Sequence, residues 1–211
     1  MSSATIPFRE RPYTQSMLLG GFTLIVCAII AMVAWTTLDS IKQRELEDTQ
    51  NMLSEVFPST LYNNHLSQEE YQLVLDGQKV HFFLGRKEGK PSGVVLFADT
   101  VGYSGTISML LGINDKGELT GVRVLSHKET PGLGDLIDLA KSHWILGFNG
   151  KSLENTTEKQ WHVKKDGGEF DSFTGATITP RGVVKGVHES LMVFAKHKEE
   201  MLNVSPEAKY E

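Results

Sequence analysis

The chain has 211 residues and a formal net charge of −5. This acidic balance argues against a nucleic-acid partner, which would require a basic face. The single cysteine, Cys27, lies in an apolar stretch, so the remainder has neither a disulfide framework nor thiolate ligands. The seven histidines show no metal-ligand spacing, and no metal site is predicted.

The first feature in chain order is an uncharged segment, Met17–Leu38. As a helix it would be about 33 Å long, enough to cross a hydrocarbon core of roughly 30 Å. A cleaved signal peptide is the competing interpretation, but this run is too long for one and no A-x-A-like site follows. We therefore expect an uncleaved transmembrane helix in membrane lipid, preceded by a tail of residues 1–16. The flanking basic residues balance, so charge alone does not give the topology.

Beyond the anchor, a polar helical pattern predicts a stalk helix over residues 39–58, ended by Pro58. One soluble domain, residues 59–211, is expected to follow, because its length suffices for a single core. Runs rich in β-branched and aromatic residues predict four strands. These are Lys79–Leu84, Gly93–Ala98, Thr106–Asn114 and Leu119–Leu125. The sequence Asn-Asp-Lys-Gly between the last two indicates a hairpin.

The C-terminal half reads as short helices, a turn at residues 164–168 and one long helix. Apolar residues at helical spacing predict that helix over Pro180–Met201. Strands followed by helices indicate an α+β domain, with an antiparallel sheet and flanking helices.

Two loops carry candidate chemistry. The first, Ser126–Asp135, follows a predicted strand and contains Pro131, Gly132 and Gly134. These residues give a tight, exposed backbone that a flat group can approach closely. His127 and Glu129 offer a donor and an acceptor for the edge of a heterocycle. An ordinary strand-to-helix turn is the alternative.

The second loop, Asp171–Pro180, presents hydroxyl side chains on small residues. Thr179 is predicted as the N-cap of the long helix, with Pro180 at its first position. A helix N-terminus suits a phosphate group, because free N–H groups and the positive end of the dipole point outward there. A plain helix cap is the alternative.

Three common nucleotide-binding and catalytic motifs do not match the sequence. No phosphate-binding G-x-x-x-x-G-K-[ST] loop occurs, and Gly132 and Gly134 have no third glycine at the dinucleotide spacing. Ser104 misses the G-x-S-x-G elbow by one position. No catalytic residue is therefore predicted.

The two loops, with two further segments, resemble a flavin-binding family. It includes the G subunit of the Rnf ion-translocating oxidoreductase and the C subunit of the sodium-pumping NADH:quinone oxidoreductase. The resemblance is carried by Gly102–Ile107, His127–Gly134, Trp144–Lys151 and Ser172–Thr179. With the single N-terminal anchor these segments span nearly the whole chain in the family's order. The short chain is more similar to the Rnf protein.

The resemblance implies that Thr177 carries one FMN per chain through a phosphoester bond, as a phosphoprotein. A periplasmic flavin transferase would make the bond from FAD and recognise the motif together with Asp171. Thr174 stands where serine is common in the family. The other cofactor-binding residues implied are Tyr103, Ser104, His127, Glu129, Thr130, Pro131, Gly132, Leu133, Gly134, Thr174, Gly175, Ala176 and Thr179.

The same resemblance implies the topology and the function. The domain would face the periplasm from the bacterial inner membrane, with residues 1–16 cytoplasmic. The chain would be a non-catalytic electron-carrier subunit, assembled with other Rnf subunits in a translocase that couples electron flow between ferredoxin and NAD to ion transport. The alternatives are a component of the quinone-oxidoreductase type, a self-contained flavin reductase or hydrolase, and an anchored sensor or scaffold.

Overall fold

The computed structural model describes residues 12–205 and 208–210, and the chain divides into two compact units, Met1–Asp48 and Thr49–Glu211. A single helix, α1 (Pro12–Val56), contains the predicted anchor and residues 39–56 of the predicted stalk, and it ends two residues before Pro58. Most of the predicted tail, residues 1–16, lies outside the described residues. Within the part of the chain that is described, no helix combines the length and the apolar character needed to cross a membrane. The anchor over Met17–Leu38 stays a prediction.

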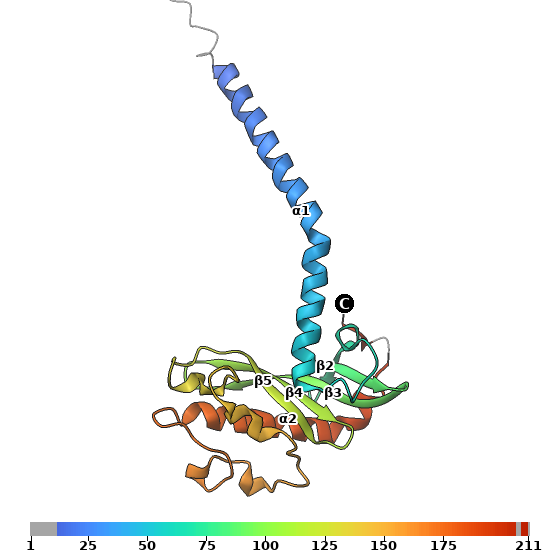
Figure 1. Ribbon diagram of the computed structural model, residues 1–211, viewed down its shortest axis with the longest axis vertical. Helices are drawn as coiled ribbons and strands as arrows, with labels where there is room; N and C mark the ends of the chain where they lie inside the picture. Colours follow the sequence, from blue (N-terminus) through green and yellow to red (C-terminus); the bar gives the residue numbers. More distant parts are fainter. Residues whose placement is uncertain (1–11, 206–207, 211) are drawn as a thin grey trace, which may run out of the picture. The chain divides into compact units, whose positions relative to one another are not determined.

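The second unit is built on an antiparallel sheet with strand order β1-β2-β3-β4-β5 (Figure 1). The antiparallel sheet and the β4–β5 hairpin are confirmed. The prediction missed β1, whose alternating Tyr71, Leu73 and Leu75 are interrupted by glutamine and valine at the positions between them. The strands are β1 Glu70–Leu75, β2 Gln78–Lys87, β3 Lys90–Val101, β4 Thr106–Asn114 and β5 Leu119–Ser126.

Alternation along the strands sends apolar side chains to both faces of the sheet. Val94 and Leu96 belong to the main core, which helix α2 (Ile178–Leu202) covers. In Figure 1 this helix, orange to red, runs along one face of the sheet. Val95, between them, belongs to a second apolar cluster on the opposite face. Both faces are buried, which explains why the central strands read as nearly continuous apolar runs.

The last turns of α1 build the second cluster. Leu53, Val56 and Phe57 are almost fully buried there. Gly112 and Gly121 sit opposite each other on β4 and β5, directly under Val56. A Cβ on Gly121 would lie 2.8 Å from the Val56 Cα, and one on Gly112 would collide with the Val56 carbonyl oxygen. These glycines let the helix backbone lie against the sheet.

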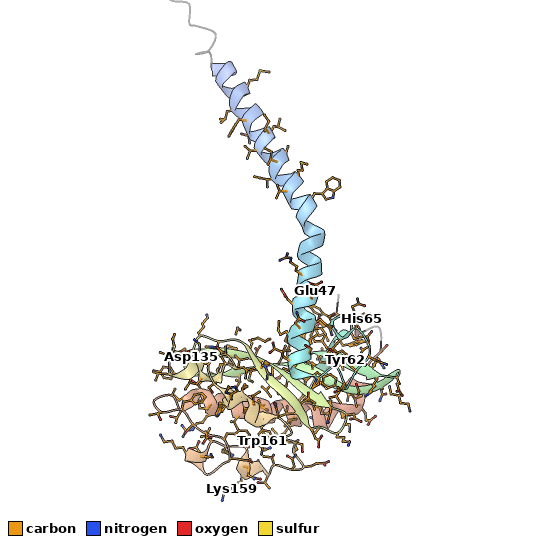
Figure 2. All side chains as sticks on the ribbon, viewed as in Figure 1. Glu47, Tyr62, His65, Asp135, Lys159 and Trp161 are labelled. Carbon is orange, nitrogen blue, oxygen red and sulfur yellow. The ribbon has the colours of Figure 1, made fainter. Side chains whose placement is uncertain are left out.

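Short 3₁₀ helices connect β5 to α2 on the α2 side of the sheet. Their aromatic residues pack together: Trp161 stacks on the His188 ring at 5.3 Å between centroids, and Phe148 stacks on Phe170 at 4.5 Å. Figure 2 labels Trp161 in this region. The helices are η3 Gly134–Ile137, η4 His143–Phe148, η5 Glu158–Gln160 and η6 Lys164–Asp166, while η2 Leu66–Gln68 precedes β1. The expected short helices are confirmed.

Gly112→Ala should lower the free energy of unfolding by about 1–3 kcal/mol, because the added methyl group overpacks the contact with Val56. Chemical denaturation of the full chain, followed by tryptophan fluorescence, measures this loss. Gly147→Ala is the matched control, because a Cβ there would meet nothing within 4 Å. Equal stability of the two variants would contradict the close approach of the helix to the sheet.

Candidate functional site

Three segments that are distant in sequence line a cavity of about 360 Å³. They are the turn after β3, the loop after β5 and the N-terminus of α2. The cavity is lined by Tyr103, Glu129, Thr130, Leu133, Gly134, Gly175, Ala176, Thr177, Ile178 and Thr179. Its volume falls within the range usual for small-molecule sites, about 300–1,000 Å³.

The loop after β5 is a tight turn. The Leu133 and Gly134 N–H groups both donate to the Thr130 carbonyl at 3.1 Å. Gly132 adopts a φ of 78°, which favours glycine, and its N–H donates to Asp135 Oδ1 at 2.7 Å. The Asp135 carboxylate, labelled in Figure 2, is thus used inside the loop. The turn exposes Leu133 at the mouth of the cavity.

His127 supports this loop and is not among the residues that line the cavity. Its Nδ1 accepts from the Glu129 N–H at 3.0 Å, which places the ring proton on Nε2. Nε2 lies 3.0 Å from Asp138 Oδ2 and donates to it. Both ring nitrogens are therefore occupied. The ring lies at the base of the loop, where it holds the backbone of Glu129, and its contact with the edge of a heterocycle stays a prediction.

Glu129 joins the three segments of the site. Its side chain lines the cavity, and the residue is only 5% exposed. Oε1 accepts from the Ser104 backbone N–H at 2.9 Å, and Oε2 accepts from the Thr179 hydroxyl. Gly134 makes room for this carboxylate, since a Cβ there would lie 2.8 Å from Oε2. One side chain thus holds the β3 turn and the start of α2 to the β5 loop.

Helix α2 begins at Ile178, so the predicted N-cap is wrong by two residues. Thr177 is the N-cap, and its side chain makes no capping hydrogen bond. Thr179 is buried, and its hydroxyl goes to Glu129 instead of capping the helix. Pro180 is accommodated in the first turn, where helix N–H groups have no intrahelical partner. The Thr177 hydroxyl is consequently available at the cavity, beside the positive end of the helix.

The segment before Thr177 is held at its base and exposed at its tip. The Trp144 Nε1–H donates to the Asp171 carbonyl at 2.9 Å, and Trp144 packs edge-on against Phe173. The Ala176 N–H donates to the Phe173 carbonyl at 3.2 Å, which closes a tight turn containing Gly175. Gly175 has a φ of 83° and lies in the cavity wall.

Ion pairs fix the same segment to its surroundings. The Asp171 carboxylate is 2.7 Å from Lys164 Nζ, with both side chains largely exposed. Arg181, in the first turn of α2, binds Asp166 through two hydrogen bonds of 2.6 Å. These hydrogen bonds hold the pKa of the Asp166 carboxyl below its usual value. The segment before Thr177 and the start of α2 are thereby both tied to η6.

The structure brings together most of the predicted site residues and separates a few. Ser104 acts through its backbone, Pro131 and Gly132 shape the loop, and Thr174 and Asp171 face solvent. Ile178 lines the cavity without having been predicted, because the helix was expected to start two residues later. The predicted residues in the cavity wall are Tyr103, Glu129, Thr130, Leu133, Gly134, Gly175, Ala176, Thr177 and Thr179.

Comparison with known proteins agrees with this layout. Residues 102–192 match the FMN-binding domain family, and the three cavity segments all lie within that range. Over 209 residues the chain is 42% identical to the G subunit of the ion-translocating oxidoreductase complex of Pseudomonas aeruginosa strain UCBPP-PA14, covering 96% of each chain. It is 39% identical to the corresponding protein of Shewanella piezotolerans, covering 90% of this chain and 92% of that one.

The chain belongs to the family of G subunits of ion-translocating oxidoreductase complexes. This confirms the resemblance seen in the sequence motifs. Among solved structures, it is similar to the C subunit of the Na⁺-translocating NADH-quinone reductase of Parabacteroides distasonis. The TM-score is 0.50 at 20% identity, covering 74% of this chain and 93% of that one, so this similarity concerns the fold.

The residues present fit a flavin nucleotide. Gly175 and Ala176 have small side chains and leave room for a ligand at the cavity wall. The apolar side chains of Leu133 and Ile178 offer contact area for an aromatic ring. The start of α2 offers N–H groups and a positive dipole to a phosphate. Thr177 supplies a hydroxyl with no capping hydrogen bond at the junction between the two.

Two threonine substitutions separate a hydroxyl that holds the fold from one that does not. Thr179→Val should lower the free energy of unfolding by about 1–3 kcal/mol, because buried Glu129 loses a donor. Thr177→Val should change the free energy of unfolding by less than about 0.5 kcal/mol. An N-cap threonine usually contributes about 0.5–2 kcal/mol, but the Thr177 side chain makes no capping hydrogen bond that could be lost. Urea denaturation of the chain without flavin gives both values. Equal losses would mean that the Thr177 hydroxyl caps the helix after all.

Proposed function

We propose that this chain is an electron-transferring subunit of an ion-translocating oxidoreductase complex and carries one FMN on Thr177 through a phosphoester bond. The supporting observation is the Thr177 hydroxyl, which lies in the cavity wall at the start of α2 without a capping hydrogen bond. The match of residues 102–192 to the FMN-binding domain family supports the identity of the cofactor.

The neighbouring hydroxyls are less suited to attachment. Thr179 is fully buried and hydrogen-bonded to Glu129. Thr174 is exposed but does not line the cavity. Thr130 lines the cavity from the β5 loop and does not belong to the N-terminal segment of α2. Only Thr177, of the threonines described in these loops, combines access to the cavity with the positive end of a helix.

Attachment would break the phosphoanhydride bond of FAD and form a phosphate ester on Thr177. The Thr177 Oγ attacks the FMN-side phosphorus of FAD, the bond to the AMP phosphate breaks, and AMP leaves while a base of the flavin transferase takes the hydroxyl proton. Asp171 is exposed six residues earlier and paired only with an exposed lysine, so the transferase has access to it.

A covalent bond would keep the flavin on the protein where noncovalent binding would not. The helix dipole contributes only roughly 0.3–1 kcal/mol to holding a phosphate at an exposed helix end. A micromolar noncovalent site corresponds to about −8.2 kcal/mol and would empty where free flavin is scarce. An ester bond on Thr177 removes that equilibrium. The flavin would supply the redox chemistry, passing electrons between partner subunits, while the protein supplies position and electrostatics.

We place the domain outside the cytoplasm, anchored by Met17–Leu38 in the inner membrane, with electron flow between ferredoxin and NAD coupled to ion transport. The anchor is supported by the uncharged sequence and by large exposed apolar side chains, among them Leu24, Ile30 and Trp35. The family to which the chain belongs supports its place in a complex with other subunits.

Protein co-expressed with a flavin transferase should keep yellow fluorescence on a denaturing gel. Thr177→Ala should abolish that fluorescence, because the attachment oxygen is lost, whereas Thr174→Ala should retain it. Mass spectrometry of the peptide containing Thr177 should show the added mass of FMN less one water. Flavin released by denaturation of the wild type, with NAD(P)H turnover by the isolated chain, would instead favour a self-contained flavin reductase.

The proposed topology is tested separately. Proteinase K added to spheroplasts should degrade residues 59–211, because this domain would lie on the outer side of the inner membrane. A cytoplasmic marker protein must survive in the same sample. Full protection of the domain until the membrane is lysed would place it in the cytoplasm and refute the orientation.

A further inference from the structure

The cavity contains a buried acid that the proposed attachment leaves unused. Among the described residues that line the cavity, Glu129 is the only one with a charged side chain. It is almost fully buried, and no lysine, arginine or histidine of the described chain forms an ion pair with it. Lys128, its neighbour in sequence, is exposed and does not line the cavity.

Several contacts of the fold fix the position of this carboxylate. The two oxygens have different donors, the Ser104 N–H on Oε1 and the Thr179 hydroxyl on Oε2. The Glu129 backbone is itself held by His127 Nδ1. Gly102 and Gly134 both lie so close that a side chain at either would meet the carboxylate. A side chain restrained in this way is fixed in position, and so is the field of its charge.

We infer that Glu129 sets the reduction potential of the flavin bound in this cavity, lowering it through a negative charge at fixed distance; this inference rests on the proposed function. Reduction takes two electrons from a donor and, near neutral pH, one proton from solvent, so the isoalloxazine gains one negative charge. A nearby carboxylate disfavours that gain, and the interaction is stronger than in open water because the Glu129 carboxylate is itself almost fully buried. Glu129 thus favours the oxidised form and makes the reduced form a better electron donor.

Glutamine is the matched substitution at this position. It keeps the shape of the side chain and removes its charge. Its carbonyl oxygen can still accept from the Ser104 N–H, and its amide can donate to the Thr179 hydroxyl, which also accepts. The fold and the hydrogen-bond network are therefore retained in Glu129→Gln while the electrostatic field is lost.

The experiment is a reductive titration of the full chain, loaded by co-expressed flavin transferase, with a reference dye. In Glu129→Gln the ratio of reduced to oxidised flavin at a fixed poise should rise about tenfold, an upward shift of about 30 mV for a two-electron couple. Glu129→Asp, which keeps the charge, should restore most of the low potential. Glu69→Gln is the control, because it removes the same charge from a residue that does not line the cavity. Glu69 directly precedes β1, which forms one edge of the sheet while β5 forms the other, and its carboxylate accepts a hydrogen bond from the Tyr71 hydroxyl.

Each outcome has a distinct meaning. A loaded Glu129→Gln with an unchanged potential, or a shift of the same size in Glu69→Gln, overturns the inference but leaves the proposed function intact. Wild-type chain without covalent flavin overturns the proposed function itself. If Glu129→Gln folds but binds too little covalent flavin to be measured, Thr130→Lys is the second test. It adds a cation next to Glu129 in the cavity wall, which should raise the reduction potential of the flavin. An unchanged reduction potential in Thr130→Lys refutes the proposed electrostatic effect of Glu129.

Discussion

The site depends on one buried carboxylate and the two donors that reach it. Glu129 receives a hydrogen bond from a turn 25 residues before it and another from a helix 50 residues after it. Glu129 thus joins the β3 turn, the β5 loop and the start of α2, beside the hydrogen bond from the Thr100 hydroxyl at the end of β3 to the Gly182 carbonyl of α2. A buried acceptor of this kind is costly when a partner is removed, so the three segments are held as a unit. The cavity lies where these three segments meet.

The sheet was predictable because its strands carry apolar residues without interruption. β4 matches its predicted range, and β5 differs by one residue, since a strong turn at Asn114–Gly117 separates them. β1 was missed because its polar residues weaken a short pattern. The start of α2 was misplaced because Thr179 and Pro180 imitate an N-cap pair. A tertiary contact overrides this local pattern: the Thr179 hydroxyl donates to the Glu129 carboxylate instead of capping the helix, which begins at Ile178.

The site was predictable as a set of loops and not as a geometry. Motifs identified the loop around Glu129 and the segment ending at Thr177, and both line the cavity. Spacing in sequence could not reveal that the His127 ring hydrogen-bonds Asp138 and the Glu129 N–H and does not line the cavity. Nor could it reveal Ile178, whose position in the wall follows from where the helix begins. Such roles are set by contacts between residues far apart in the chain, which a single sequence does not display.

The close contact of Val56 with Gly112 and Gly121 has a consequence for the N-terminal boundary of the domain. Leu53, Val56 and Phe57 cover one face of the sheet, and the compact unit starts at Thr49, inside α1. A fragment cut at Pro58 would uncover Phe83 and Leu110 and leave an apolar face open to water. Soluble expression therefore calls for a cut before Thr49. The segment entering the domain is a structural part of it, and a flexible tether could not take its place.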